Sequence, residues 1–125
     1  MSVDMTGAMG EYLETKFNVP TFVQLPAIRP PKFLFIDRTG GGHLRLASDY
    51  PFFTIEAWAT TKKEAYDLVT AVRYHVVREL PPLIGGIRII KHAESSPPVY
   101  TPTTAAESFR YQFTIAIRHQ LVEEK

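Results

Sequence analysis

The chain has 125 residues, of which 45% are hydrophobic, a size and composition that suit a single domain over residues 1–125 with one packed core. Its 14 lysines and arginines nearly balance its 13 aspartates and glutamates, and the net charge of +1 argues against a protein that holds nucleic acid mainly by charge. The absence of cysteine excludes disulfides, zinc thiolate sites and thiol nucleophiles. The N-terminus lacks the regions of a secretory signal and no apolar run could cross a membrane, so we expect a soluble protein made in a cytoplasm.

The first part of the chain predicts a helix followed by a proline-rich lead-in. Apolar residues at helical spacing predict a short N-terminal helix over Met5–Phe17, although Gly7 and Gly10 each weaken it by about 1 kcal/mol. The next segment, 19–31, contains four prolines. A short strand at Phe22–Leu25 is therefore expected at the edge of a sheet, where a missing amide donor is tolerated.

The next segments predict a hairpin. Residues 32–38 read as a strand that is apolar on both sides, which indicates burial on both faces, with a partner subunit as the first candidate for the second cover. Thr39–Gly42 is a turn sequence. Residues 43–48 return as an alternating strand with Leu44 and Leu46 on one face.

The middle of the chain carries the strongest local signals. Phe52–Ala59 predicts a strand, and Thr61 with Glu64 matches a capping box in which the Thr61 hydroxyl bonds the Glu64 amide and the Glu64 carboxylate reaches back to the Thr61 amide. A long amphipathic helix follows. The Pro81–Pro82 pair ends it, because proline has no amide hydrogen and restricts the residue before it.

The last part predicts two strands separated by a long loop. Residues 87–93 read as a strand, and 94–108 as an extended, proline-rich loop. Residues 109–119 alternate cleanly between apolar and polar and predict a half-buried strand. The tail 120–125 is expected to fray.

These elements predict an α+β fold: a mainly antiparallel four- to five-stranded sheet, one long helix packed on one face and a short N-terminal helix. The face without the helix carries Phe52 and Trp58 among polar residues. We therefore expect a second surface that something other than the helix buries.

Patterns that could carry chemistry each have a plainer interpretation. The glycines of the 39–42 segment lie between two predicted strands, which favours a hairpin turn over a phosphate-binding loop. His75 and Glu79, four residues apart on the long helix, could offer two metal ligands, but a surface histidine pairing with Glu79 is favoured because no further ligand is evident. No G-x-S-x-G elbow is present. We predict no catalytic, cofactor or metal residues.

Two residues of the predicted strand 52–59 leave alternatives open. Glu56 is either a lone carboxylate whose charged form the neighbouring indole disfavours, or a charge paired with Arg110 or Arg118 across the sheet, and the second is favoured. Trp58 is open to two equal interpretations, an anchor at a protein interface and ordinary core packing.

Four segments follow one another in an informative order and spacing. They are the N-terminal helix with the lead-in 26–31, a strand ending in residues 37–42, the strand 53–59 running into the helix through residue 73, and the closing strand 109–118. Over about residues 10–119 this order resembles the tail terminator proteins of long-tailed (siphovirus-type) bacteriophages, particularly those of actinobacterial hosts.

The resemblance implies a non-enzymatic structural protein of the virion, without cofactor. Such proteins form a ring, a homohexamer, at the head-proximal end of the tail tube, where they stop tube polymerisation and form the docking surface for the head connector. The implied partners are other copies of the chain, the tail tube protein and the head–tail connector protein, and DNA passes through the lumen without specific binding. The implied location is the head-proximal end of the virion tail.

Ring contacts in this family come from loops and sheet edges, which match the 39–42 and 94–108 segments here. Together with the apolar second face, this gives the interface candidates Phe33, Phe35, Thr39, Gly40, Gly41, Gly42, Trp58, Pro97, Pro98, Val99, Tyr100 and Pro102.

Two alternatives remain open. The first is a head-completion or connector-adaptor protein of the same particle, which has a similar size and fold class. The second belongs to another class: a small ligand-binding or enzymatic α+β domain that uses Glu56, His75 or His92 in a cleft. That hypothesis requires the three side chains to converge.

Overall fold

The computed structural model describes residues 3–103 and 108–123. Within these residues the chain forms two helices and seven strands. In chain order they are α1 (Met5–Phe17), β1 (Thr21–Phe22), β2 (Phe33–Gly41), β3 (Ser48–Asp49), β4 (Pro51–Ala59), α2 (Lys62–Arg78), β5 (Leu83–Ile84), β6 (Ile87–Tyr100) and β7 (Phe109–Glu123).

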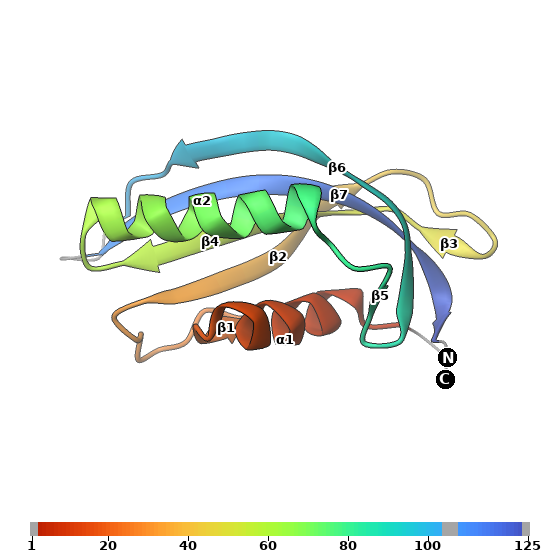
Figure 1. Cartoon of the computed structure of the whole chain (residues 1–125), viewed down its shortest axis with the longest axis horizontal. Coiled ribbons are helices and arrows are strands. Elements are labelled where there is room, and N and C mark those ends of the chain that lie inside the picture. The colour runs from red at the N-terminus through yellow and green to blue at the C-terminus, as the bar shows by residue number, and fades with distance from the viewer. Residues whose placement is uncertain (1–2, 104–107, 124–125) are drawn as a thin grey trace.

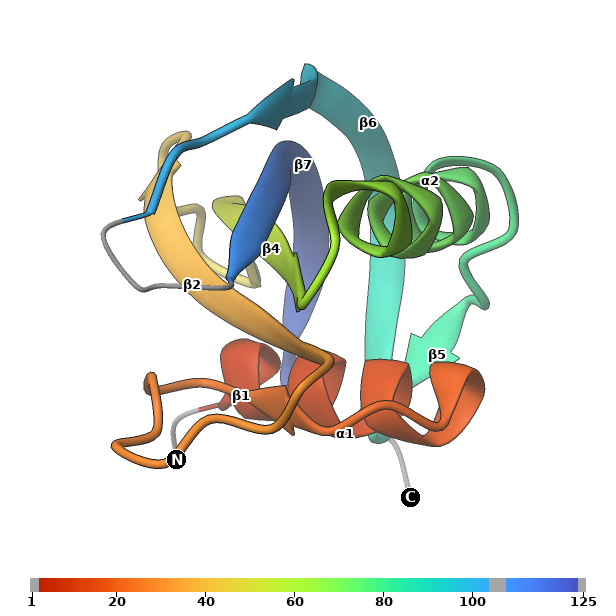
Figure 2. The ribbon, with the colours of Figure 1, turned by 90° about the vertical axis from the view of Figure 1, so that its left-hand side faces the viewer.

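All the described strands belong to one mixed sheet. Its order is β1-β2-β4-β7-β6-β5, and β3 pairs with the C-terminal part of β7. The β1–β2 pair is parallel and the other pairs are antiparallel. The long strands curl, so that β6 arches over β7 and the sheet has a distinct inner face (Figure 2).

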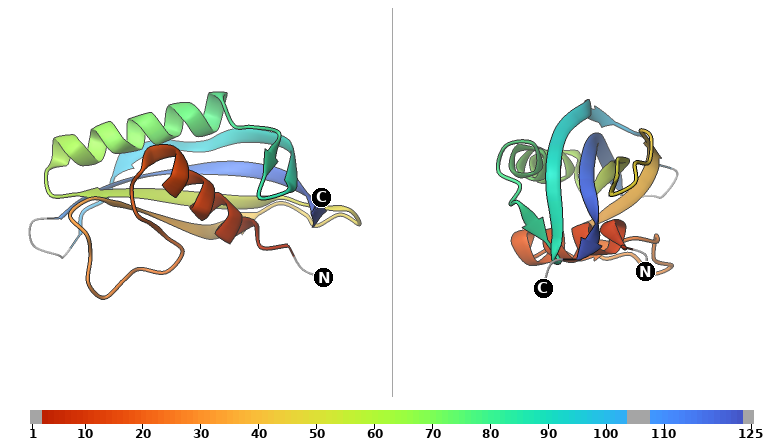
Figure 3. Two further views of the ribbon diagram at one scale, coloured as in Figure 1. Left: turned by 60° about the horizontal axis from the view of Figure 1, so that its bottom comes forward. Right: turned by 90° about the vertical axis from the view of Figure 1, so that its right-hand side faces the viewer.

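Both helices pack on the inner face and share one hydrophobic core. α2 lies against β4, β6 and β7, while α1 contacts β1, β2 and β5 (Figures 1 and 3). The core is formed by alternate residues of the long strands together with the apolar sides of both helices. Its largest fully buried side chains include Phe53, Phe113, Met9, Leu13, Ile36 and Ile55.

Both helices begin at residues that cap their free amides. The Asp4 carboxylate accepts the Gly7 amide at 2.9 Å, and the Thr61 hydroxyl accepts the Glu64 amide at 3.2 Å. The second half of the predicted capping box differs, because the Glu64 carboxylate accepts a hydrogen bond from the Thr61 hydroxyl. α1 ends at Asn18, which adopts the left-handed conformation (φ 53°) that asparagine tolerates.

The predicted fold, one long helix on a four- to five-stranded mainly antiparallel sheet, is wrong. The sheet has seven strands in the described residues, includes a parallel pair and is covered by two helices rather than one. Three of the strands, β1, β3 and β5, have only two residues, too few to show an alternating pattern. The boundaries of α1 match the predicted helix 5–17. The packing of α1 on the sheet was not predicted.

The predicted hairpin between residues 32–38 and 43–48 is also wrong. β2 continues through Gly41 and pairs with β4, from Phe33 opposite Trp58 to Gly41 opposite Pro51. Residues 42–47 form no strand and connect β2 to β3.

The predicted loop 94–108 is a strand for nearly half of its length. β6 continues through Pro97 and Pro98 to Tyr100, while residues 104–107 lie outside the described part of the chain. Within the described residues β6 pairs with β5 only at its start, so its other edge is open at the prolines. Its register with β7 shifts between Ser96 and Val99, and neither Pro97 nor Pro98 has a paired residue in β7, so the ladder needs neither of their missing amides. The predicted frayed tail is strand as far as Glu123, and residues 124–125 lie outside the described range.

An ion pair fastens α2 to β6. The guanidinium of Arg73 meets the carboxylate of Glu94 in a two-pronged contact, with Nε–Oε1 at 2.5 Å and Nη2–Oε2 at 3.0 Å. Because Arg–carboxylate forks fix geometry as well as charge, this pair holds β6 against the helix at the position where the sequence predicts the start of a loop.

A two-glycine turn joins β5 to β6 next to Ala8 of α1. Gly85 (φ 56°) and Gly86 (φ 76°) both adopt positive φ, which is what a tight two-residue hairpin turn requires. A Cβ added to Gly85 would lie 3.1 Å from the Cβ of Ala8 in α1.

We therefore expect Gly85→Val to lower the free energy of unfolding by about 1–2 kcal/mol, because it places a branched side chain in the left-handed region and against α1. Gly40→Val is the matched control: Gly40 lies in a strand, and a Cβ there would meet nothing closer than 4.0 Å. Urea unfolding followed by circular dichroism measures both. Equal effects of the two substitutions would contradict this account of the turn.

Candidate interaction surfaces

The face of the sheet opposite the helices, the outer face, holds a stacked aromatic pair. The rings of Phe33 and Trp58 stack with centroids 5.4 Å apart, and each side chain is only 2% exposed. The guanidinium groups of Arg29 and Arg110 lie 4.8 and 5.2 Å from the centre of the indole. The proline-rich segment that carries Arg29 thus helps to bury Trp58 within its own subunit, so neither aromatic ring is available to a partner in this conformation.

Glu56 is part of the same arrangement. Its Oε1 accepts a hydrogen bond from the indole nitrogen of Trp58 at 2.9 Å and lies 3.6 Å from Nη1 of Arg110. This confirms the favoured interpretation, a charge paired across the sheet with Arg110. Next to it, the hydroxyl groups of Thr39, Thr54 and Thr114 form a row at 2.8 and 3.0 Å, which satisfies the buried hydroxyl of Thr54.

The segment 42–47, which we call the arm, projects from the end of the sheet beyond β3 (Figures 1 and 3). Its two leucines point to solvent, with Leu44 67% exposed and Leu46 102% exposed. All six residues of the arm are exposed. An ordered projection that presents two large apolar side chains is typical of a surface that binds another protein.

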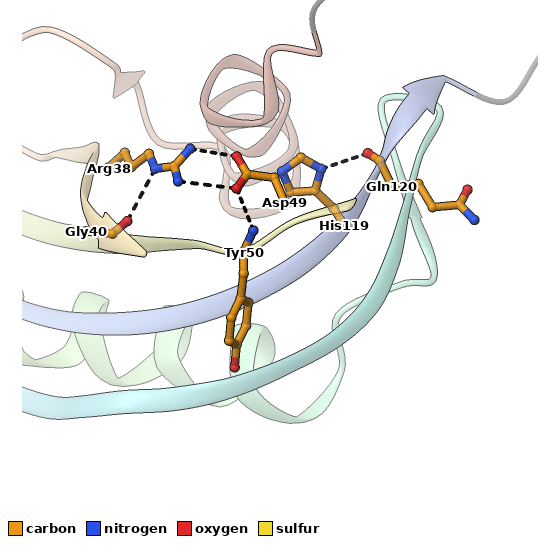
Figure 4. A network of polar contacts seen from close by, with 6 residues as sticks. All are labelled: Arg38, Gly40, Asp49, Tyr50, His119 and Gln120. Carbon is orange, nitrogen blue, oxygen red and sulfur yellow. Dashed lines mark hydrogen bonds and ion pairs between the residues drawn. The ribbon is translucent and has the colours of Figure 1, made fainter. Parts of the chain in front are cut away.

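The base of the arm is clamped by the polar network in Figure 4. Arg38 binds the carboxylate of Asp49 through Nη1–Oδ2 at 2.8 Å, and Asp49 also accepts the Tyr50 amide at 2.8 Å. The hydrogen bond from Arg38 is the main cause that lowers the pKa of Asp49 below its usual value. Asp49 is paired with His119 of β7 in the sheet, so the Arg38–Asp49 contact, which we call the clamp, connects the arm to β7.

Backbone hydrogen bonds hold the arm as well. The Gly42 amide donates to the Tyr50 carbonyl at 2.8 Å, the Arg45 amide to the Ser48 carbonyl at 2.9 Å, and the Leu121 amide to the Ala47 carbonyl at 3.1 Å. At Gly42 a Cβ would fall 2.6 Å from the Tyr50 ring, so the glycine is needed for the close approach of the two segments. The arm is therefore held in one shape before any partner binds.

The remaining interface candidates lie in three places. Phe35 is half-buried in β2, whereas Thr39, Gly40, Gly41 and Gly42 are exposed where β2 leads into the arm. In β6, Pro97 and Val99 are exposed, while Pro98 and Tyr100 are half-buried. Tyr100 packs against Tyr111 and Lys62, and the carbonyl of the exposed Pro102 accepts a hydrogen bond from Arg110 at 3.0 Å.

The side chains required by the enzymatic alternative have separate surroundings. Glu56 lies on the outer face, as described above, whereas His75 lies between the two helices. His92 lies in β6 beside the end of α2, and its buried Nδ1 has no hydrogen-bond partner among the described residues. Within those residues no hydrogen bond or ion pair joins any two of the three.

His75 is not the surface residue that the sequence predicted. It does pair with Glu79, with Nδ1–Oε1 at 3.6 Å, but it is only 7% exposed. Its Nε2 lies 2.5 Å from the hydroxyl of Tyr12 in α1, and the ring of Phe17 packs edge-on against it. His75 is therefore a link between the helices.

No group of three or more His, Cys, Asp or Glu side chains that could hold a metal ion exists in residues 3–103 and 108–123. The same residues contain no helix with the length and apolar character of a membrane span. Comparison with known proteins found no family model and no curated protein that matches the chain.

Sequence reasoning missed the arm and the link between the helices. The alternation of Leu44 and Leu46 suggested a strand, because spacing does not tell whether a leucine packs on a sheet or projects from it. Tyr12 and His75 are separated by 63 positions, and nothing in either local pattern indicates that they meet.

Proposed function

We propose that this protein is a structural subunit of a long-tailed bacteriophage, a tail terminator that forms a ring at the head-proximal end of the tail tube. In this role it ends polymerisation of the tail tube protein and offers the docking surface for the head–tail connector protein. It acts without a cofactor or a catalytic residue, and it is located in the virion.

The order of sequence segments that resembles this family motivates the proposal, and the arm is the structural observation that carries it. Leu44 and Leu46 are held away from the body of the subunit on the clamped arm. Their apolar side chains are exposed to water there and do not stabilise the subunit. Such a projection is expected in a protein that assembles. It has no evident use in a small enzyme.

Charge supports the same role. A ring through which DNA passes must not hold the DNA, because attraction to phosphates would slow its movement. The net charge of +1 gives little general attraction to a polyanion.

The test is a nonsense mutation of the gene for this chain in the phage that carries it, with complementation by the intact gene. Tail lengths and head attachment are measured by electron microscopy. We expect tails longer than normal and without heads, because the tube end is not capped, and normal virions after complementation. Tails of normal length beside unjoined heads would instead assign the chain to the head–tail adaptor role, and normal virions without it would refute both roles.

A further inference from the structure

A hollow of about 190 Å³ lies on the side of α1 next to β1, lined by Gly7, Gly10, Glu11, Glu14, Thr21 and Val23. Gly10 leaves its floor open, because a Cβ at that position would reach to 3.4 Å from Cγ1 of Val23. Val23 is 51% exposed and gives the hollow an apolar side. The Val23 side of the hollow therefore has room for an aliphatic side chain.

The rim of the hollow is acidic. Glu11 is exposed and forms no ion pair within the described residues, whereas Glu14 accepts the Thr21 amide at 2.9 Å. The arm is complementary: Arg45 lies between its two exposed leucines, and within the described part of the chain its side chain has no ion pair. The aliphatic tip and the cation on the arm thus match the Val23 side of the hollow and the Glu11 carboxylate on its rim.

The arm and the hollow belong to different parts of the subunit. The arm projects beyond β3 at one end of the subunit, whereas α1 and β1, which border the hollow, lie along its lower side near the middle (Figure 1). A contact between them therefore joins two copies head to tail, and such a contact closes into a ring when the rotation between copies permits.

We propose that the arm of one copy docks in the α1 hollow of the next copy, with Leu46 in the hollow and Arg45 against Glu11. This rests on the proposed function, because it supplies the contact between neighbours in the ring. The clamp at Arg38 and Asp49 keeps the arm ordered in the free subunit, so little conformational freedom is lost on docking.

The first test reverses charges and measures association by sedimentation velocity. Arg45→Glu or Glu11→Arg alone should weaken self-association about tenfold or more, because each variant brings like charges together. An equal mixture of the two variants should associate like the wild type, since every arm then finds an opposite charge. Arg78→Glu, an exposed change on α2, is the matched control and should leave association unchanged. Failure of the mixture to regain association would overturn the contact.

The second test uses the absence of cysteine in the natural chain. Leu46→Cys in one preparation is mixed with Val23→Cys in another under mild oxidation, and disulfide-linked dimers are followed by non-reducing gel electrophoresis. We expect them to form at least ten times faster than in the control mixture of Leu46→Cys with Val99→Cys, whose second site is similarly exposed on β6. Equal rates in the two mixtures would refute docking in the hollow.

The two proposals fail separately. Rings at the tail end without the Leu46–Val23 cross-link would leave the terminator role intact and remove this contact. A specific cross-link in a protein whose loss leaves tail length and head attachment normal would establish the contact and remove the role.

Discussion

Replacing Trp58 by alanine is expected to lower the free energy of unfolding by about 3–5 kcal/mol, because it empties a fully packed aromatic site. The ring is 2% exposed in the single subunit, where it stacks on Phe33 and donates its indole hydrogen to Glu56. The loss should be the same at every protein concentration, since no other copy contributes to the site.

Urea unfolding by circular dichroism, repeated over a hundredfold range of concentration, measures this. Tyr74→Ala is the control, because Tyr74 is 56% exposed and its removal should change stability by only about 0.5 kcal/mol or less. A Trp58→Ala protein of unchanged stability that no longer self-associates would mean that Trp58 is an interface anchor.

The second large effect is expected for Tyr12→Phe, which should destabilise the protein by about 1–3 kcal/mol at neutral pH. The substitution removes the hydroxyl 2.5 Å from Nε2 of His75 and leaves that buried nitrogen without its partner. Tyr66→Phe, at a 51% exposed position, is the matched loss of a hydroxyl and should be nearly neutral. Equal stabilities of the two variants would show that the contact between the helices contributes nothing.

The same substitution should change how stability depends on alkaline pH. Burial, and secondarily the negative charge of Glu79, raise the pKa of Tyr12 above its ordinary value of 10.0. A group whose pKa is higher in the folded state stabilises the fold fully below its unfolded pKa and loses this contribution as the pH rises through the folded pKa. Stability of the wild type should therefore fall more steeply above pH 10 than that of Tyr12→Phe, as thermal unfolding at several pH values would show. Parallel curves would contradict this.

Local signals in the sequence were enough to predict the helices, whose ends are marked by capping residues and prolines, and the two strands with clear alternation. Thr61 caps α2, which begins at Lys62 and ends at Arg78, before the Pro81–Pro82 pair, and α1 has the predicted boundaries. β4 and β7 show clear alternation, which also predicted that Glu56 pairs across the sheet with Arg110 or Arg118; the partner is Arg110. These features depend on neighbours in sequence or on one pair of adjacent strands.

The rest depends on contacts that local patterns do not encode. Prolines predicted a loop at Pro97 and Pro98, because the sequence does not show that β6 has an irregular register between Ser96 and Val99 that accommodates them. Phe52 and Trp58 predicted a second face buried by a partner subunit, since nothing in the pattern indicates that Arg29 and its segment fold back over Trp58. For the same reason the pattern of residues 43–48 predicts a strand of a hairpin where the structure has the arm.

The open edge of β6 has a consequence for the solubility of the chain. An unpaired strand edge invites further strands to add in unlimited number, as in fibrils. Because the amides of consecutive strand residues point to opposite edges, one proline of the Pro97–Pro98 pair removes an amide donor from the open edge. The register of β6 also shifts between Ser96 and Val99, which interrupts the regular ladder that an incoming strand would extend. The chain thereby discourages indiscriminate stacking while leaving its clamped arm free for a contact of defined geometry.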